Sequence, residues 1–105
     1  MIKKSSFART KWSASQLQEY IRKESANTIN VIFLPHALKR MRERKINMVC
    51  ALETLRKGRI NLPPEIDSNT GDIKCRMEYF VAGADVKIVV AIGDDNPNLI
   101  IVTVI

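Results

Sequence analysis

The spacing of apolar residues changes near the middle of the chain. In the first half, apolar residues recur three and four positions apart, which is typical of helices with one buried face. The first such stripe consists of Leu17, Tyr20 and Ile21. Ser13 precedes this stripe and Gln16 follows three residues later, the pairing of a capping box. The pattern predicts an amphipathic helix over residues 14–25.

The segment from Pro35 to Ile46 predicts a second helix with sharply divided faces. Residues 31–34 before it are apolar and predict either a brief strand or an extended entry segment. Pro35 suits a first helical turn, where its missing N–H needs no partner. On a wheel of about 100° per residue, the apolar face carries Ala37, Leu38 and Met41. The opposite face carries His36, Lys39, Arg40, Glu43 and Arg44.

A third helix is predicted between Asn47, a residue suited to the N-cap, and Gly58, a residue suited to a helix end. Its buried stripe is expected to consist of Met48, Leu52 and Leu55. Only two residues separate Lys45 from the next predicted helix, so we expect the second and third helices to be antiparallel neighbours joined by a tight connection.

From Arg59 onward the apolar period is two, which is typical of strands. A short strand over 59–62 is predicted to end at Pro63 and Pro64, and a half-buried strand is predicted over 73–81. The apolar segments 86–92 and 99–105 follow after short turns, and the first of these is continuous enough to be central. The predicted fold class is α+β, with the N-terminal helices packed on one face of an antiparallel β-meander of three to four strands.

The length of 105 residues indicates one domain, which we place over residues 13–105. Residues 1–12 are basic and are expected to form a flexible lead-in with Phe7 and Trp12 as anchors. No apolar run approaches the roughly 20 residues of a membrane span, and no secretory signal is evident.

Cys50 and Cys75 are the two cysteines, and they are far apart in the sequence. We expect them to be reduced, packed thiols in a cytoplasmic protein. With one histidine and no cysteine cluster, neither a metal site nor a cofactor is expected.

The net charge of +6 is unevenly distributed. Residues 1–45 hold eleven Lys and Arg against three Glu, a net +8, whereas residues 46–105 hold six against eight acids, a net −2. A basic half is typical of proteins that face a polyanion, with nucleic acid ahead of an anionic membrane surface. We expect RNA as the partner and no membrane. A basic surface that is merely solvated is the alternative.

His36 is the only histidine, and the predicted helix places it beside Arg40 and Arg44 at i, i+4 and i+8. Neighbouring cations disfavour a charged imidazole, which would leave His36 available as a base. RNA cleavage without metal needs a general base, a general acid and cations for the developing phosphorane charge. We therefore expect His36 to transfer a proton, Arg40 and Arg44 to stabilise charge, and Glu43 to orient His36 or act as a second acid or base. Alternatively, His36 caps the helix or binds the preceding turn.

Further cations extend this candidate site. Lys39 and Arg44 lie on the same helical face as His36, and Lys74 and Arg76 share one face of the strand over 73–81. These four residues are predicted to bind nucleic acid, provided that the strand face meets the basic helix. Otherwise Lys74 and Arg76 are ordinary surface charges.

The run of His36, Ala37, Arg40, Met41, Arg44 and Ile46 resembles a motif of a bacterial and phage family of small domains of unassigned function. The resemblance covers residues 31–105 and includes the helix ending at Gly58, the strand around Arg76 and the closing strand over 101–105. That family is grouped with RelE/ParE-like toxins. The resemblance implies a compact helix-plus-sheet fold and an acidic antitoxin as partner. It also implies an endoribonuclease activity on free or ribosome-bound RNA or, as in other relatives, the poisoning of gyrase.

The sequence thus leads to three hypotheses. The first is a cytoplasmic, metal-independent endoribonuclease of the toxin–antitoxin type. The second is a non-catalytic nucleic-acid-binding or regulatory module. The third is an interaction domain whose basic helix binds an acidic protein. The oligomeric state and the role of the N-terminal helix stay open.

Overall fold

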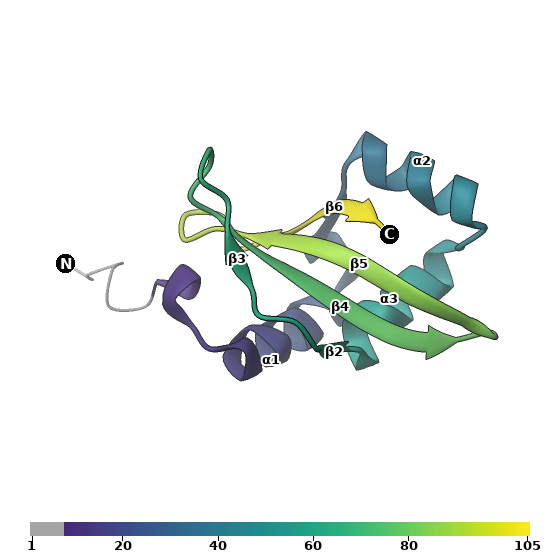
Figure 1. The fold of residues 1–105 in the computed structure, drawn as a ribbon, viewed down its shortest axis with the longest axis horizontal. Coiled ribbons are helices and arrows are strands. Elements are labelled where there is room, and N and C mark those ends of the chain that lie inside the picture. The colour runs from purple at the N-terminus through teal and green to yellow at the C-terminus, as the bar shows by residue number, and fades with distance from the viewer. Residues whose placement is uncertain (1–7) are drawn as a thin grey trace.

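A computed structural model describes residues 8–105 and shows an α+β fold with three helices and one mixed sheet (Figure 1). The helices are α1 (Ala14–Ser25), α2 (Pro35–Arg44) and α3 (Met48–Lys57). The strands are β1 (Val31–Phe33), β2 (Arg59–Ile60), β3 (Glu65–Ile66), β4 (Ile73–Val81), β5 (Ala84–Ile92) and β6 (Leu99–Val104). Two short 3-10 helices, η2 (Arg9–Lys11) and η3 (Thr28–Asn30), flank α1.

The sheet has the strand order β1-β6-β5-β4-β2, and β3 also pairs with β4. The predicted antiparallel meander is confirmed for β4, β5 and β6, with β5 in the centre as expected. The count of three to four strands is wrong, because the sheet has six strands and β1 pairs in parallel with β6. These partners are separated by most of the chain, and local patterning carries no information about so distant a pairing.

Helix boundaries agree closely with the sequence pattern. Ser13 and Gln16 form the predicted capping box, and Asn47 caps α3 by accepting a hydrogen bond from the Cys50 amide at 2.8 Å. The second helix ends at Arg44 rather than Ile46, because Lys45 adopts a left-handed conformation with φ 57°. This residue turns the chain away from the helix axis.

The packing of α3 differs from the prediction in two respects. Its buried residues are Ala51, Thr54 and Leu55, and Met48 is 40% exposed. Thr54 can be buried because its hydroxyl donates to the Cys50 carbonyl at 2.8 Å. The tight connection predicted between α2 and α3 is confirmed, since only residues 45–47 separate them, but the two helices pack mainly on different elements. After the turn at Lys45, α3 packs on β4, β5 and α1, whereas α2 packs on β6.

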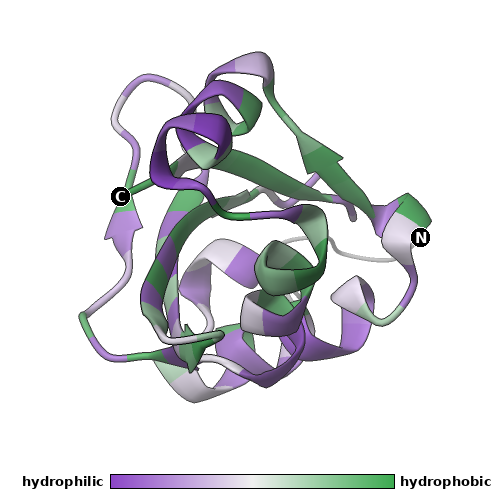
Figure 2. Cartoon of the chain, turned by 90° about the vertical axis from the view of Figure 1, so that its right-hand side faces the viewer, coloured by the Kyte–Doolittle hydropathy of each residue, from purple (hydrophilic) through white to green (hydrophobic). Residues whose placement is uncertain are grey.

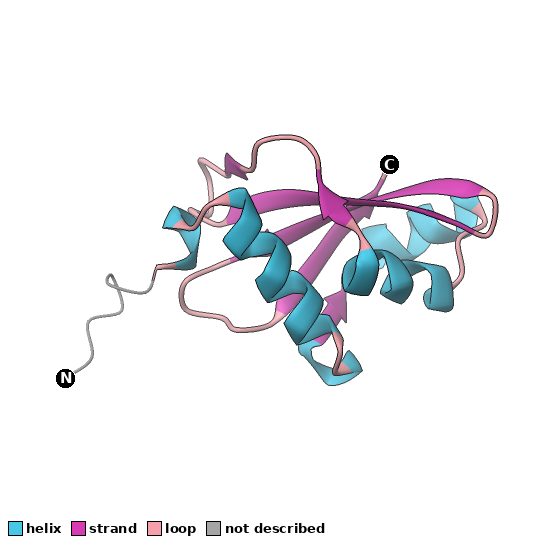
Figure 3. Ribbon diagram, turned by 90° about the horizontal axis from the view of Figure 1, so that it is seen from below, coloured by secondary structure: helices cyan, strands magenta, loops and turns pink. Residues whose placement is uncertain are grey.

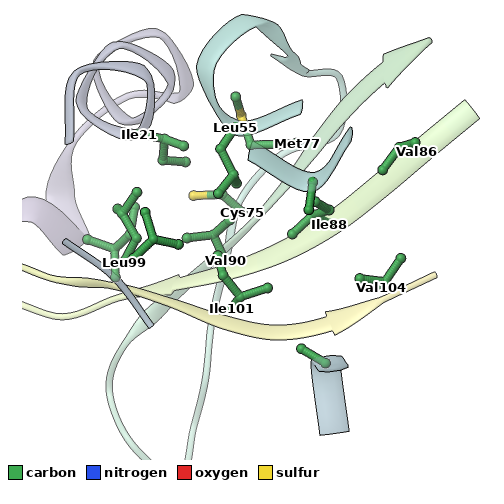
Figure 4. Packing of buried hydrophobic residues seen from close by; sticks show 14 of the residues in the cluster. Ile21, Leu55, Cys75, Met77, Val86, Ile88, Val90, Leu99, Ile101 and Val104 are labelled. Atoms are coloured by element: carbon green, nitrogen blue, oxygen red, sulfur yellow. The ribbon is translucent and has the colours of Figure 1, made fainter. Parts of the chain in front are cut away.

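The core lies between the sheet and the helices. Seen from below, α1 and α3 lie in front of the strands (Figure 3). Figure 4 shows Ile21 of α1 and Leu55 of α3 meeting the inward side chains of the central strands. Cross-strand partners share this buried face: Met77 lies opposite Ile88 and Cys75 lies opposite Val90, all at most 1% exposed. The cluster also includes Ala37 and Met41 of α2.

The segment before α1 is hydrogen-bonded to the loop between β5 and β6. Arg9 Nε donates to the Gly93 carbonyl at 3.0 Å, and the Thr10 amide donates to Asp94 Oδ1 at 3.0 Å. Trp12 packs edge-on to Tyr20, with ring centroids 5.3 Å apart. Trp12 is therefore an anchor, as predicted. Phe7, the other predicted anchor, lies outside the described residues.

Candidate nucleic-acid interface on helix α2

Helix α2 has a buried face and a charged face, as its sequence predicts. Ala37 is fully buried and Met41 is 5% exposed, so the apolar stripe faces the core. Pro35 occupies the first turn after an extended Leu34. The exposed residues of the helix and its C-cap are Pro35, His36, Lys39, Arg42, Glu43, Arg44 and Lys45. In Figure 2 the outward side of α2 is hydrophilic over most of its length.

Arg40 is fixed within this helix rather than free. Its Nε donates to the Val104 carbonyl at 3.1 Å, and its Nη1 donates to Glu43 Oε1 at 3.2 Å. The Ile105 amide, in the same peptide group as the Val104 carbonyl, donates to Lys87 of β5. The Val104 carbonyl therefore points away from β5, to the side of β6 on which β1 lies. Because β1 pairs with β6 only as far as Ile101, no strand supplies a donor to this carbonyl. Arg40 satisfies that carbonyl and so ties α2 to the sheet.

His36 lies exposed in the first turn of α2. Within residues 8–105 its ring makes no hydrogen bond or ion pair, and no side chain caps the N-terminus of the helix. The alternative that His36 caps α2 is therefore wrong. The carboxylate of Glu43 pairs with Arg40 and not with the imidazole.

Lys39 and Arg44 are exposed on the same helix and are without salt-bridge partners among the described residues. The predicted residues brought together on α2 are thus His36, Lys39, Arg40, Glu43 and Arg44. Two of the five, Arg40 and Glu43, are engaged with each other.

The other two predicted residues, Lys74 and Arg76, lie on the face of β4 opposite the core. Lys74 Nζ pairs with Asp67 at 3.0 Å and Arg76 Nε pairs with Glu78 at 3.0 Å. The hydrogen bond from Lys74, aided by bonds from the Asn69 and Thr70 amides, lowers the pKa of Asp67. Among the described residues, none of α2 lines the cavity in which Lys74 and Arg76 lie. The predicted site residues therefore fall into two groups.

That cavity, which we call the outer-face cavity, has a volume of about 640 Å³. It lies between the outward face of the sheet and the segment after β2. Its lining residues are Leu62, Pro63, Glu65, Lys74, Cys75, Arg76, Val89, Val102 and Thr103. Pro63 and Pro64 predict the end of a strand in the sequence. The pairing of the next residues, β3, with β4 covers only two residues, which is too short to be predicted from the pattern.

Neither cysteine is one of the predicted site residues, although Cys75 is among the residues that line the outer-face cavity. Both are free thiols; Cys50 is half-buried, and burial raises the pKa of Cys75 to about 12. Within residues 8–105, no group of three or more His, Cys, Asp or Glu side chains is placed to hold a metal ion. No described helix combines the length and apolar character needed to cross a membrane.

Residues 33–105 match a protein family described as a domain of unknown function (DUF4258). The chain belongs to this family. The DUF4258 segment contains α2, α3, β2 to β6 and the last residue of β1, whereas α1 lies outside it. Neither a curated protein nor a solved structure matches the chain. Nothing in these comparisons links the DUF4258 domain to RelE/ParE toxins.

Proposed function

We propose that this protein is a metal-independent endoribonuclease that holds RNA against the exposed face of α2. The observation that carries the proposal is the exposed imidazole of His36, with the cationic side chains of Lys39 and Arg44 on the same helix and no protein partner for any of the three within residues 8–105. Cations without carboxylate partners are available to phosphate oxygens, and an imidazole beside them is a group that can transfer a proton.

The chemistry assigns one role to each group. His36 takes the proton from a ribose 2′-hydroxyl as its oxygen attacks the adjacent phosphorus. The bond from phosphorus to the 5′-oxygen breaks, the departing oxygen receives a proton from a general acid or water, and the products are a 2′,3′-cyclic phosphate and a 5′-hydroxyl. Lys39 and Arg44 stabilise the charge on the phosphorane. Arg40 and Glu43 position the helix, because they are bonded to Val104 and to each other.

The wider setting of the proposal is a toxin–antitoxin pair. We propose that the fold follows the RelE/ParE-like plan, a proposal supported by the combination of helices with an antiparallel meander, and that the protein is cytoplasmic. Its RNA is free or bound to the ribosome. An acidic antitoxin would cover the charged face of α2, since Glu43 is the only acid in that helix.

A second candidate is a non-catalytic nucleic-acid-binding module. It is favoured by the pairing of Glu43 with Arg40, which leaves His36 without a bonded carboxylate on its own helix. Binding alone needs only the exposed cations of α2, and the phosphate contacts would carry most of the affinity.

The candidates are separated by one set of measurements on labelled single-stranded RNA in EDTA. The variants are Lys39→Ala on α2 and the matched control Lys23→Ala on α1, both of which remove an exposed lysine. The proposal predicts cleavage, together with binding that weakens with salt. The logarithmic salt slope should shrink by about 0.7 in Lys39→Ala and stay unchanged in Lys23→Ala.

Each outcome has a distinct meaning. Salt-dependent binding without cleavage supports the non-catalytic module. No binding at low salt contradicts both RNA candidates and leaves an acidic protein partner for α2. Equal effects of the two lysine substitutions would place the RNA elsewhere than on α2.

A further inference from the structure

The outer-face cavity combines the volume of a small-molecule site with a partly apolar lining. Its volume of about 640 Å³ falls within the range of small-molecule sites. Val89 and Val102 form an apolar floor on the sheet, and Leu62 and Pro63 provide apolar side chains from the segment that follows β2. Leu62 is 49% exposed, so an apolar surface is open to a ligand.

Two polar groups with unused hydrogen-bonding capacity adjoin this apolar floor. Arg76 uses Nε for Glu78, but its two terminal nitrogens make no hydrogen bond with residues 8–105. The carboxylate of Glu65 likewise has no hydrogen-bond or ion-pair partner among these residues. The cavity thus offers a pair of donors and a pair of acceptors.

The strand register fixes how these two groups lie relative to each other. Glu65 is directly opposite Lys74 across the β3–β4 pair, and Lys74 and Arg76 are two residues apart on one face of β4. Glu65 and Arg76 are therefore diagonal neighbours, with Cβ atoms about 7 Å apart. Arg76 of β4 pairs with Val89 of β5, and Val89 pairs with Thr103 of β6. These three residues therefore lie in one row across the outward face of the sheet.

We propose that the outer-face cavity binds a guanine base. Guanine presents two adjacent acceptors, O6 and N7, that fit the paired nitrogens of an arginine. Its neighbouring edge presents two N–H donors that fit a carboxylate such as Glu65. Adenine places an amino donor where guanine has O6, so it would oppose the donors of Arg76.

The charges in the cavity favour a neutral base over a phosphate group. Lys74 is neutralised by Asp67 and Arg76 is partly neutralised by Glu78, while Glu65 adds a negative charge. A phosphate there would meet this carboxylate at close range. The source of the base rests on the proposed function, in which RNA supplies it, but a free guanine nucleotide presents the same edges.

Calorimetric titration with GMP, AMP, CMP and UMP tests the proposal on the full chain. GMP should bind at least about tenfold more tightly than the other three nucleotides. Glu65→Gln should abolish this preference, because an amide presents only one acceptor to the two N–H groups. The matched control Glu19→Gln, at an exposed position of α1, should retain it. Equal binding of the four nucleotides, no binding, or an unchanged preference in Glu65→Gln would overturn the proposal.

Single-stranded RNA oligomers with one guanine or one adenine distinguish the source of the base. A guanine preference in both GMP and RNA supports an RNA base in the cavity. GMP binding without RNA binding supports a free nucleotide and contradicts the proposed function instead. RNA binding that depends on Lys39 but shows no guanine preference, in RNA or in GMP, supports the proposed function and overturns the guanine site. Thermal unfolding of each variant confirms that it is folded.

Discussion

Arg40 Nε donates a hydrogen bond of 3.1 Å to the Val104 carbonyl, joining α2 to the end of the last strand. The two residues are 64 positions apart in the chain. The bond gives the Val104 carbonyl a donor at a sheet edge where no strand pairs with it. Arg40 Nη1 also donates to Glu43 Oε1 at 3.2 Å. Arg40 therefore has a structural role beneath the charged face that includes His36, Lys39 and Arg44.

Replacing Arg40 with alanine should destabilise the fold. The substitution removes a charged donor from a partly buried carbonyl, a loss of about 1.5–3 kcal/mol in the free energy of unfolding. Urea denaturation measures this change. Lys39→Ala, the neighbouring exposed cation, should stay within about 0.5 kcal/mol of wild type. Equal small effects of both substitutions would show that the Arg40–Val104 bond contributes nothing.

Helix α1 should be indispensable to the DUF4258 domain although it lies outside the matched residues. Leu17 and Ile21 of α1 are fully buried in the shared core. Leu17→Ala should lower the free energy of unfolding by about 2–5 kcal/mol, because it leaves a cavity beneath the helix. The exposed residue Ser15 provides the control, and Ser15→Ala should be nearly neutral. A cooperative unfolding transition of unchanged midpoint in Leu17→Ala would contradict this placement of α1.

The Lys74–Asp67 pair should be visible in an acid titration. Lys74 lowers the pKa of Asp67, so the charged carboxylate stabilises the fold above the pKa of the unfolded state. This contribution is lost as the pH falls through the lower pKa of the folded state. NMR titration of the Asp67 carboxyl should show a higher pKa in Lys74→Met than in wild type. An unchanged pKa in Lys74→Met would contradict the dominant role of the lysine.

The two thiols should differ sharply in reactivity. Cys75 is 1% exposed and burial raises its pKa to about 12, whereas Cys50 is half-buried. The thiolate is the reactive form, so a thiol reagent at pH 8 should modify Cys50 first. Cys75 should react only as the protein unfolds. Comparison of Cys50→Ser with Cys75→Ser measures each rate separately, and rapid labelling of Cys75 in folded Cys50→Ser would contradict its burial.

The sequence predicted elements well and their partners less well. Helix caps and strand alternation depend only on residues near in the sequence, and these predictions are confirmed at Ser13, at Asn47 and over residues 73–81. The parallel pairing of β1 with β6 depends on a distant partner, and it was missed.

The same distinction applies to the candidate site. The wheel placed His36 and Lys39 on the exposed face correctly. It could not show that Arg40 bonds Val104, or that Lys74 and Arg76 face a separate cavity, because both depend on how the sheet and helix meet.

A comparison of wild type with His36→Ala is the sharpest test of metal-free RNA cleavage by His36. Both proteins are incubated in excess over a labelled RNA in EDTA, and the single-turnover rate is measured alongside RNA affinity. The single-turnover rate should be at least about 100-fold lower in His36→Ala. The RNA affinity of His36→Ala should stay within about twofold of wild type, because the neighbouring cations remain. Cleavage by His36→Ala at the wild-type rate would contradict a proton-transfer role for His36.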